Sequence, residues 1–179
     1  MENLPDSIKP RSAISIQRLQ LAHAPVFLEA VARSAALHNR WVSPPNTLET
    51  FRGQVEKCSG DRNVSYLAIQ GEADLVGCIN VSEIVRGAFQ SAYLGFYAFV
   101  PYAGQRLMKQ AMRLVITEAF STLGLHRLEA NVQPMNERST KLVESLGFRR
   151  EGFSPRYLKI GDQWCDHHRY AITAEDWIV

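Results

Sequence analysis

Apolar residues dominate the stretch from Ala92 to Val100, where aromatic, β-branched and aliphatic side chains follow one another as in a buried strand. A four-residue turn, Pro101 to Gly104, leads from it into a long helix. This helix carries one apolar stripe at helical spacing, made by Met108, Met112, Val115 and Ala119. Its first amides have no partner within the helix, and the helix dipole adds partial positive charge there. We therefore expect a phosphate-bearing ligand at residues 103–108.

The spacing of apolar positions predicts the other elements in the same way. Before the central strand, it predicts a strand at residues 14–19, helices at 24–36 and 47–58, and a hairpin of strands at 64–70 and 75–81. After the long helix, it predicts a strand at residues 128–132, a short helix capped by Asn136, and long strands at 148–160 and 163–172. This order is that of an α+β chain built on one mostly antiparallel sheet.

Length and composition narrow the class of protein. The 179 residues fit one domain, residues 1–179, in which the polar residues 1–13 form an arm. No run approaches the roughly 18 apolar residues of a membrane helix, and the N-terminus lacks the apolar centre of a signal peptide. The three cysteines form no CxxC pair, so we expect neither disulfides nor bound metal, and a cytoplasmic setting. A formal net charge of +2 is too small to indicate nucleic-acid binding.

The C-terminal half carries a series of spaced motifs. They are Leu125-His126-Arg127, Glu129-Ala130, Asn136 with Ser139, Leu146-Gly147-Phe148, Glu151-Gly152, and Trp164 with Asp166-His167. With these motifs, residues 92–177 resemble the GNAT superfamily of acyl-CoA-dependent N-acyltransferases. Within it, they resemble the branch of ribosomal-protein N-terminal acetyltransferases of the Rim type. The match upstream of residue 92 is only general.

This resemblance implies a GNAT fold, with six or seven strands splayed at the centre of the sheet and helices on its faces. It implies acetyl-CoA as donor, with its pyrophosphate on the amides of Ala103, Gly104, Gln105, Arg106, Leu107 and Met108. The pantetheine arm would enter the splay and pair with the backbone of Tyr97, Ala98, Phe99 and Val100. A bulge near Gly95 and Phe96 would aim an amide at the thioester carbonyl, as an oxyanion donor. Alternatively, Gly95 marks no more than an irregular strand.

The phosphate loop departs from the family pattern at its first and last positions, which Pro101 and Arg106 occupy. Since the family also accepts alanine at the last position, that residue need not have positive φ, and backbone geometry does not exclude Arg106. Its side chain would either crowd the pyrophosphate or bind a phosphate from the helix start.

Three further residues match chemical roles in the Rim-type branch. Ser139 matches the serine placed to protonate the leaving thiolate, and Asn136 matches the asparagine that holds the cofactor arm. Glu151 matches a glutamate proposed as base, which would need burial to raise its pKa. The alternatives are a solvated serine in the first helical turn, a plain helix cap, and a surface ion pair of Glu151 with Arg149 or Arg150.

The other chemical side chains are interpreted as structural. His167 and His168 point to opposite faces of a strand and cannot clamp a metal together, and we read His126 likewise as structural. The cysteines are taken as core residues, so no acyl-enzyme is expected. Trp41, Phe96 and Tyr157 are candidates for the wall of the acceptor site, although ordinary packing explains them as well.

We expect an acetyl-CoA-dependent N-acetyltransferase that acts by direct attack of a primary amine in a ternary complex. The acceptor is either a protein N-terminal α-amine or a small-molecule amine, and the donor either acetyl-CoA or a longer acyl-CoA such as succinyl-CoA. The competing hypothesis is a binding or regulatory module without turnover. Family resemblance also makes a homodimer through edge strands an expectation.

Overall fold

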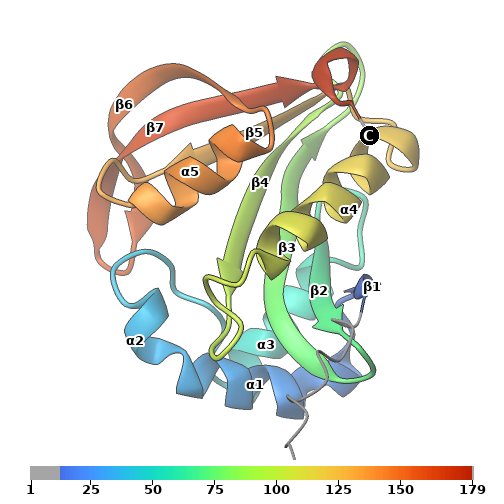
Figure 1. Ribbon diagram of the computed structural model, residues 1–179, viewed down its shortest axis with the longest axis vertical. Coiled ribbons are helices and arrows are strands. Elements are labelled where there is room, and N and C mark those ends of the chain that lie inside the picture. Colours follow the sequence, from blue (N-terminus) through green and yellow to red (C-terminus); the bar gives the residue numbers. More distant parts are fainter. Residues whose placement is uncertain (1–12, 179) are drawn as a thin grey trace, which may run out of the picture.

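The computed structural model describes residues 13–178, in which seven strands form one mixed sheet (Figure 1). The predicted arm lies, apart from Ala13, outside the described residues. The strands are β1 (Ile14–Arg18), β2 (Val64–Gln70), β3 (Asp74–Val85), β4 (Ser91–Ala98), β5 (Arg127–Val132), β6 (Arg149–Ile160) and β7 (Gln163–Thr173). The helices are η1 (Leu21–His23), α1 (Ala24–Arg33), α2 (Ala35–His38), α3 (Leu48–Lys57), α4 (Leu107–Ser121), α5 (Glu137–Ser145) and η2 (Ala174–Asp176). Within residues 13–178, no helix combines the length and the apolar character that a bilayer crossing requires.

The sheet has the order β1-β2-β3-β4-β5-β7-β6, and β4 and β5 are its one parallel pair in the described residues. These two strands pair only where residues 91–93 face residues 127–129. Beyond Tyr93 and Glu129 they separate, while β4 stays paired with β3 and β5 with β7. This confirms the predicted α+β class, the mostly antiparallel sheet and the splay at its centre.

Helices cover both faces of the sheet, and each face has its own core (Figure 1). Leu94 of β4 packs in a cluster with residues of α4 and α5, whereas Tyr97 and Phe99 point the other way and pack with α1 and α3. In the second cluster the ring of Phe27 lies 4.7 Å from that of Phe51 and 5.7 Å from that of Phe99, centroid to centroid. Burying each such ring stabilises the fold by about 1.5–3 kcal/mol.

The single helix predicted at residues 24–36 is interrupted at Ser34, which separates α1 from α2. The hydroxyl of Ser34 accepts a hydrogen bond of 3.0 Å from the amide of Val100, just after β4. This contact ties the α1–α2 corner to the end of the central strand. It brings α2 to the mouth of the gap between β4 and β5.

Two expectations about the central unit are wrong. The register of β3 and β4 is unbroken past Gly95 and Phe96, and the irregularity lies instead between Ser82 and Val85 of β3. Arg106 has a φ of +65°, in the left-handed region. The reason is that the turn from β4 into α4 uses two left-handed residues, Gly104 at φ +83° and Arg106, to redirect the chain.

Candidate active site

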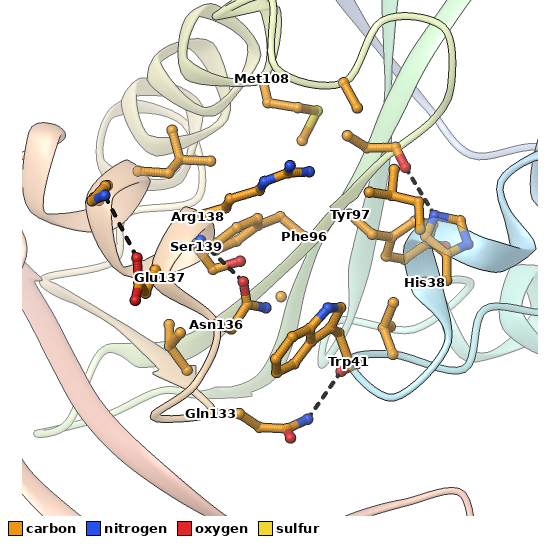
Figure 2. Close-up of a pocket in the computed structure, with 18 of the residues that line it drawn as sticks. His38, Trp41, Phe96, Tyr97, Met108, Gln133, Asn136, Glu137, Arg138 and Ser139 are labelled. Atoms are coloured by element: carbon orange, nitrogen blue, oxygen red, sulfur yellow. Dashed lines mark hydrogen bonds and ion pairs between the residues drawn. The ribbon is translucent and has the colours of Figure 1, made fainter.

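A cavity of about 1480 Å³ runs through the gap between β4 and β5. From one face of the sheet it is lined by residues of α4 and α5, and from the other by residues of α2 and the loop after it. Figure 2 shows Phe96 near its middle, with Ser139 and Arg138 on one side and Tyr97 and His38 on the other. Because β4 and β5 no longer form backbone hydrogen bonds with each other here, their backbone edges face the cavity.

The walls near α4 and α5 carry more positive than negative charge. Arg106, Lys109, Arg138 and Lys141 line the cavity, against the single carboxylate of Glu137 among its wall residues. That carboxylate lies 3.7 Å from the ammonium of Lys141, one turn along α5. Three cationic side chains thus remain for an anionic ligand.

The turn before α4 presents several free amides. Ala103 and Gln105 donate their amides to the carbonyls of Phe99 and Tyr102, at 3.0 and 3.4 Å. The amides of Gly104, Arg106, Leu107 and Met108 have no main-chain partner within residues 13–178. Of the predicted stretch 103–108, four amides are therefore free of main-chain partners, and the other two close the turn.

The exposed edge of β4 ends at Ala98. Phe99 bonds to Val76 of β3, so by the alternation of an antiparallel pair the amide of Phe96 points toward the gap. The carbonyl of Ala98 accepts a hydrogen bond of 2.8 Å from Nε2 of His38. Phe99 and Val100 lie outside the cavity wall, since Val100 is bound to Ser34 and to the guanidinium of Arg33. Of the backbone residues predicted to pair with the pantetheine arm, Tyr97 to Val100, Tyr97 and Ala98 thus line the cavity, next to Phe96.

Asn136 and Ser139 both line the cavity at the start of α5 (Figure 2). The side-chain oxygen of Asn136 caps the helix by accepting the amide of Ser139 at 3.2 Å. This cap stabilises the first turn of α5, in which Ser139 lies at the cavity wall.

Glu151 lies apart from the cavity wall. Its carboxylate accepts two hydrogen bonds from Arg127, which also binds Glu129 at 3.0 Å. The hydrogen bond from Arg127 lowers the pKa of Glu151, and burial opposes this shift only in part. The condition for a base role, burial that raises its pKa, is therefore not met. The partner is Arg127 rather than Arg149 or Arg150.

The wall beyond the gap is formed by Trp41, Gln133, Asn131 and His167. Gln133 donates to the carbonyls of Arg40 and Trp41, at 3.1 and 3.4 Å, and so fastens the Trp41 loop to the end of β5. Figure 2 shows the bond to Trp41. Of the three predicted acceptor-wall residues, Trp41 and Phe96 line the cavity and Tyr157 does not. The ring of Tyr157 lies 6.2 Å from that of His167, and its hydroxyl lies 3.5 Å from that of Tyr93.

The histidines differ in their surroundings. His126 lies 3.1 Å from Glu175, and the ring of His168 packs between Phe153 and Tyr170, both away from the cavity. His38 and His167 are buried in its wall, and burial lowers the pKa of both. Residues 13–178 contain no group of three or more histidine, cysteine or acidic side chains placed to hold a metal.

Sequence comparison identifies the family. The family model described as an acetyltransferase (GNAT) domain matches residues 14–149, about three quarters of the chain. The chain belongs to the GNAT acetyltransferase family. The splayed sheet and the amides before α4 are where the resemblance to this family predicted them.

Several characterised or named proteins are similar to this GNAT chain. It is 40% identical to the ribosomal protein uS5-alanine N-acetyltransferase of Escherichia coli (strain K12), over 59% of this chain and 55% of that protein. It is 39% identical to "Probable N-acetyltransferase YjcK" of Bacillus subtilis (strain 168), over 57% and 56% of the two chains. The matched region thus spans little more than half of the length of these relatives.

Among solved structures, RimJ of Mycobacterium smegmatis in complex with CoA-disulfide has the same fold. Its TM-score is 0.83 at 23% identity, covering 92% of this chain and 83% of that one. The GNAT fold therefore extends across the N-terminal half, where motifs alone gave only a general match.

The cavity residues that the sequence analysis did not single out include His38, Asn131 and Arg138. Asn131 had a usable signal, because it alternates with Ala130 and Val132 and must face away from their core. His38 had none, since only the packing of α2 against β4 brings it to the gap.

Proposed function

We propose that this protein transfers an acetyl group from acetyl-CoA to a primary amine by direct attack in a ternary complex. The observation that carries the proposal is the cavity through the splayed sheet, with free amides and cations at one end and Ser139 beside the gap. The amides of Gly104 and residues 106–108, with nearby cations, suit a diphosphate. Family membership supports acetyl-CoA as the ligand that carries it.

The chain's own groups have distinct tasks in this proposal. The backbone edge of residues 96–98 binds the extended arm of the donor as an added strand. The amide of Phe96 stabilises the oxyanion that forms when the amine attacks the thioester carbonyl. Asn136 holds the donor arm through its remaining amide hydrogens, and the hydroxyl of Ser139 gives a proton to the departing thiolate.

For the acceptor, we propose the N-terminal α-amine of a protein. The support is the similarity to the uS5-alanine N-acetyltransferase over 59% of this chain. The second candidate is a small-molecule amine, because Trp41 in the wall beyond the gap comes from the N-terminal half, where the motifs gave only a general match. The additional arginine of the phosphate loop, Arg106, is the observation that favours testing longer acyl donors such as succinyl-CoA beside acetyl-CoA.

A thiol-release screen tests donor and acceptor together. Acetyl-CoA and succinyl-CoA are offered with peptides that have free N-termini, the same peptides with blocked N-termini, and a panel of small amines. We expect thiol release with acetyl-CoA and free N-termini, at a rate well above that with blocked peptides. Isothermal titration with acetyl-CoA runs in parallel. Binding without release from any amine would instead identify a binding module, and the absence of both would remove the transferase assignment.

The role of Ser139 is tested by Ser139→Ala. If its hydroxyl protonates the thiolate, kcat falls about 10²-fold while the KM for acetyl-CoA stays within about threefold. Ser121→Ala is the matched control, because its hydroxyl bonds to the carbonyl of Thr117 at 2.7 Å at the far end of α4. Equal kcat values for Ser139→Ala and Ser121→Ala would remove Ser139 from the chemistry.

A further inference from the structure

Two hydrogen-bond acceptors in the cavity wall beyond the gap have no partner within the described chain. The first is Oδ1 of Asn131, which is buried and accepts no hydrogen bond within residues 13–178. A buried acceptor without a partner carries the free-energy cost of the hydration that it has lost. A ligand that brings an N–H donor to this place would recover that cost.

The second acceptor belongs to His167, which is only 3% exposed. Its Nδ1 lies 2.9 Å from the carbonyl oxygen of Cys165. Because a carbonyl can only accept, Nδ1 must carry the hydrogen, and in the neutral ring Nε2 then holds a free lone pair. Nε2 makes no hydrogen bond within the part of the chain that the structure describes.

The sheet places these two groups together. Asn131 pairs with Arg169 across β5 and β7, and Val132 pairs with His168. Ala130, Val132 and Tyr170 belong to the core under α4 and α5, so Asn131 and His167 face the opposite side. Both line the cavity that Ser139 lines from the α5 side. Ser139 therefore faces the gap from one side of the sheet, and the hydrogen-bond acceptors of Asn131 and His167 face it from the other.

We propose that Asn131 and His167 form the acceptor-amine site, in which Oδ1 of Asn131 binds an N–H of the amine and Nε2 of His167 removes its proton. This inference rests on the proposed function and adds to it the residues that prepare the nucleophile. The ligand class is a primary ammonium group, because only a donor-rich group satisfies two acceptors at once.

The protons balance in the following way. An ammonium nitrogen loses one proton to Nε2 of His167, which later passes it to solvent. The freed lone pair then forms the N–C bond at the thioester carbonyl. The C–S bond breaks, the sulfur takes the hydroxyl proton of Ser139, and the nitrogen's second proton returns to that hydroxyl through water. The products are the acetylated amine and free CoA thiol, with one proton released to solvent.

The charges around His167 suit a base that is neutral near pH 7. Burial lowers its pKa from the ordinary value of 6.5, and the hydrogen bond to Cys165 and the charge of Asp166 oppose this only in part. The titratable groups around it are Tyr157 from β6, Cys165, Asp166 and Arg169 from β7, and His38 across the cavity, while β5 contributes the uncharged Asn131 and Gln133.

His167→Asn is the first test, because an asparagine amide can still donate to Cys165 while offering no basic nitrogen. We expect kcat at pH 7 to fall about 10²-fold. The decrease in kcat that wild type shows as the pH falls below 6.5 should be absent from the variant. The KM for acetyl-CoA should stay within about threefold. His168→Asn is the matched control, since this neighbour lies on the other face, and its kcat and pH profile should not change.

Asn131→Ala separates binding from proton removal. Loss of one hydrogen bond to a charged group should raise the KM for the amine about tenfold or more while the pH dependence of kcat remains that of wild type. An unchanged KM for the amine in the folded variant would remove Asn131 from the site.

Nitrogen NMR of the wild-type imidazole gives a readout that needs neither turnover nor a variant. We expect His167 to carry its proton on Nδ1 at pH 7 and to titrate below 6.5. A proton on Nε2, or a folded His167→Asn with wild-type kcat and pH profile, would overturn the proposal. Failure of the proposed function has another signature, which is absence of thiol release with every amine in the wild-type protein.

Discussion

At the scale of the residue, Arg106 combines backbone strain with a useful charge. It holds a left-handed φ of +65° at the N-cap of α4 and lines the cavity. For a side chain with a Cβ atom, this conformation costs about 1–2 kcal/mol. We expect Arg106→Gly to raise the Tm by roughly 2–6 °C, measured by calorimetry, because glycine removes the cost.

The same position tests donor binding. If the guanidinium binds a phosphate, Arg106→Gly and Arg106→Ala should both raise the Kd for acetyl-CoA by about tenfold in isothermal titration. Only the glycine variant should be stabilised, because alanine keeps the Cβ atom at positive φ. Tighter binding in both variants would instead show that the side chain crowds the pyrophosphate.

At the scale of the element, Gly77 of β3 allows α4 to lie close to the sheet. A Cβ atom on Gly77 would clash with Sδ of Met108 and would lie 2.6 Å from the carbonyl oxygen of Tyr97. The second contact is with backbone that cannot turn aside. We expect Gly77→Ala to destabilise the fold by about 1–3 kcal/mol, measured by urea unfolding, and to weaken acetyl-CoA binding by moving the start of α4.

Gly53 is the matched control for this substitution. It lies in the middle of α3, and a Cβ atom there would meet nothing within 4 Å. Gly53→Ala should therefore stabilise the protein by about 0.5–1 kcal/mol and leave acetyl-CoA binding unchanged. Equal losses in both variants would mean that close approach at Gly77 is not what matters.

At the scale of the whole molecule, the Arg127 network links β5 to the edge strand β6 and makes the stability of the fold depend on pH in the acidic range. Arg127 and Glu129 lie on β5, where it still pairs with β4, and Glu151 lies on β6. Arg127 lowers the folded-state pKa of Glu151 from its usual 4.5. Such a carboxylate adds stability above the unfolded pKa, and this stability is lost as pH falls through the folded value.

The expected outcome is that Glu151→Gln has a lower Tm than wild type at pH 7 and that the difference shrinks below about pH 4.5. Thermal melting between pH 3 and pH 7 measures it. Glu72→Gln, in the β2–β3 turn and without an ion pair among the described residues, should show no such trend. The base role predicted for Glu151 stays a prediction, and an unchanged pH–rate profile in Glu151→Gln would remove it.

Local sequence patterns predicted the elements and the part of the cavity that we propose for the donor. Hydrophobic periodicity and turn residues act between near neighbours, so they predicted the strand, turn and helix around residues 92–121, the Asn136 cap and the α+β order. Motifs then predicted the GNAT fold and the cavity positions of Phe96, Asn136 and Ser139. These features depend on local backbone preference and on spacing along the chain.

Which groups share the cavity, and which charge they carry, depends instead on packing between distant parts of the chain. Asn131 and His167 meet through the register of β5 and β7, and α2 brings His38 to the edge of β4. Arg127, rather than a neighbour in sequence, sets the pKa of Glu151. Burial, partner and tautomer arise from contacts between residues far apart in the chain, and for that reason the spacing of residues did not contain them.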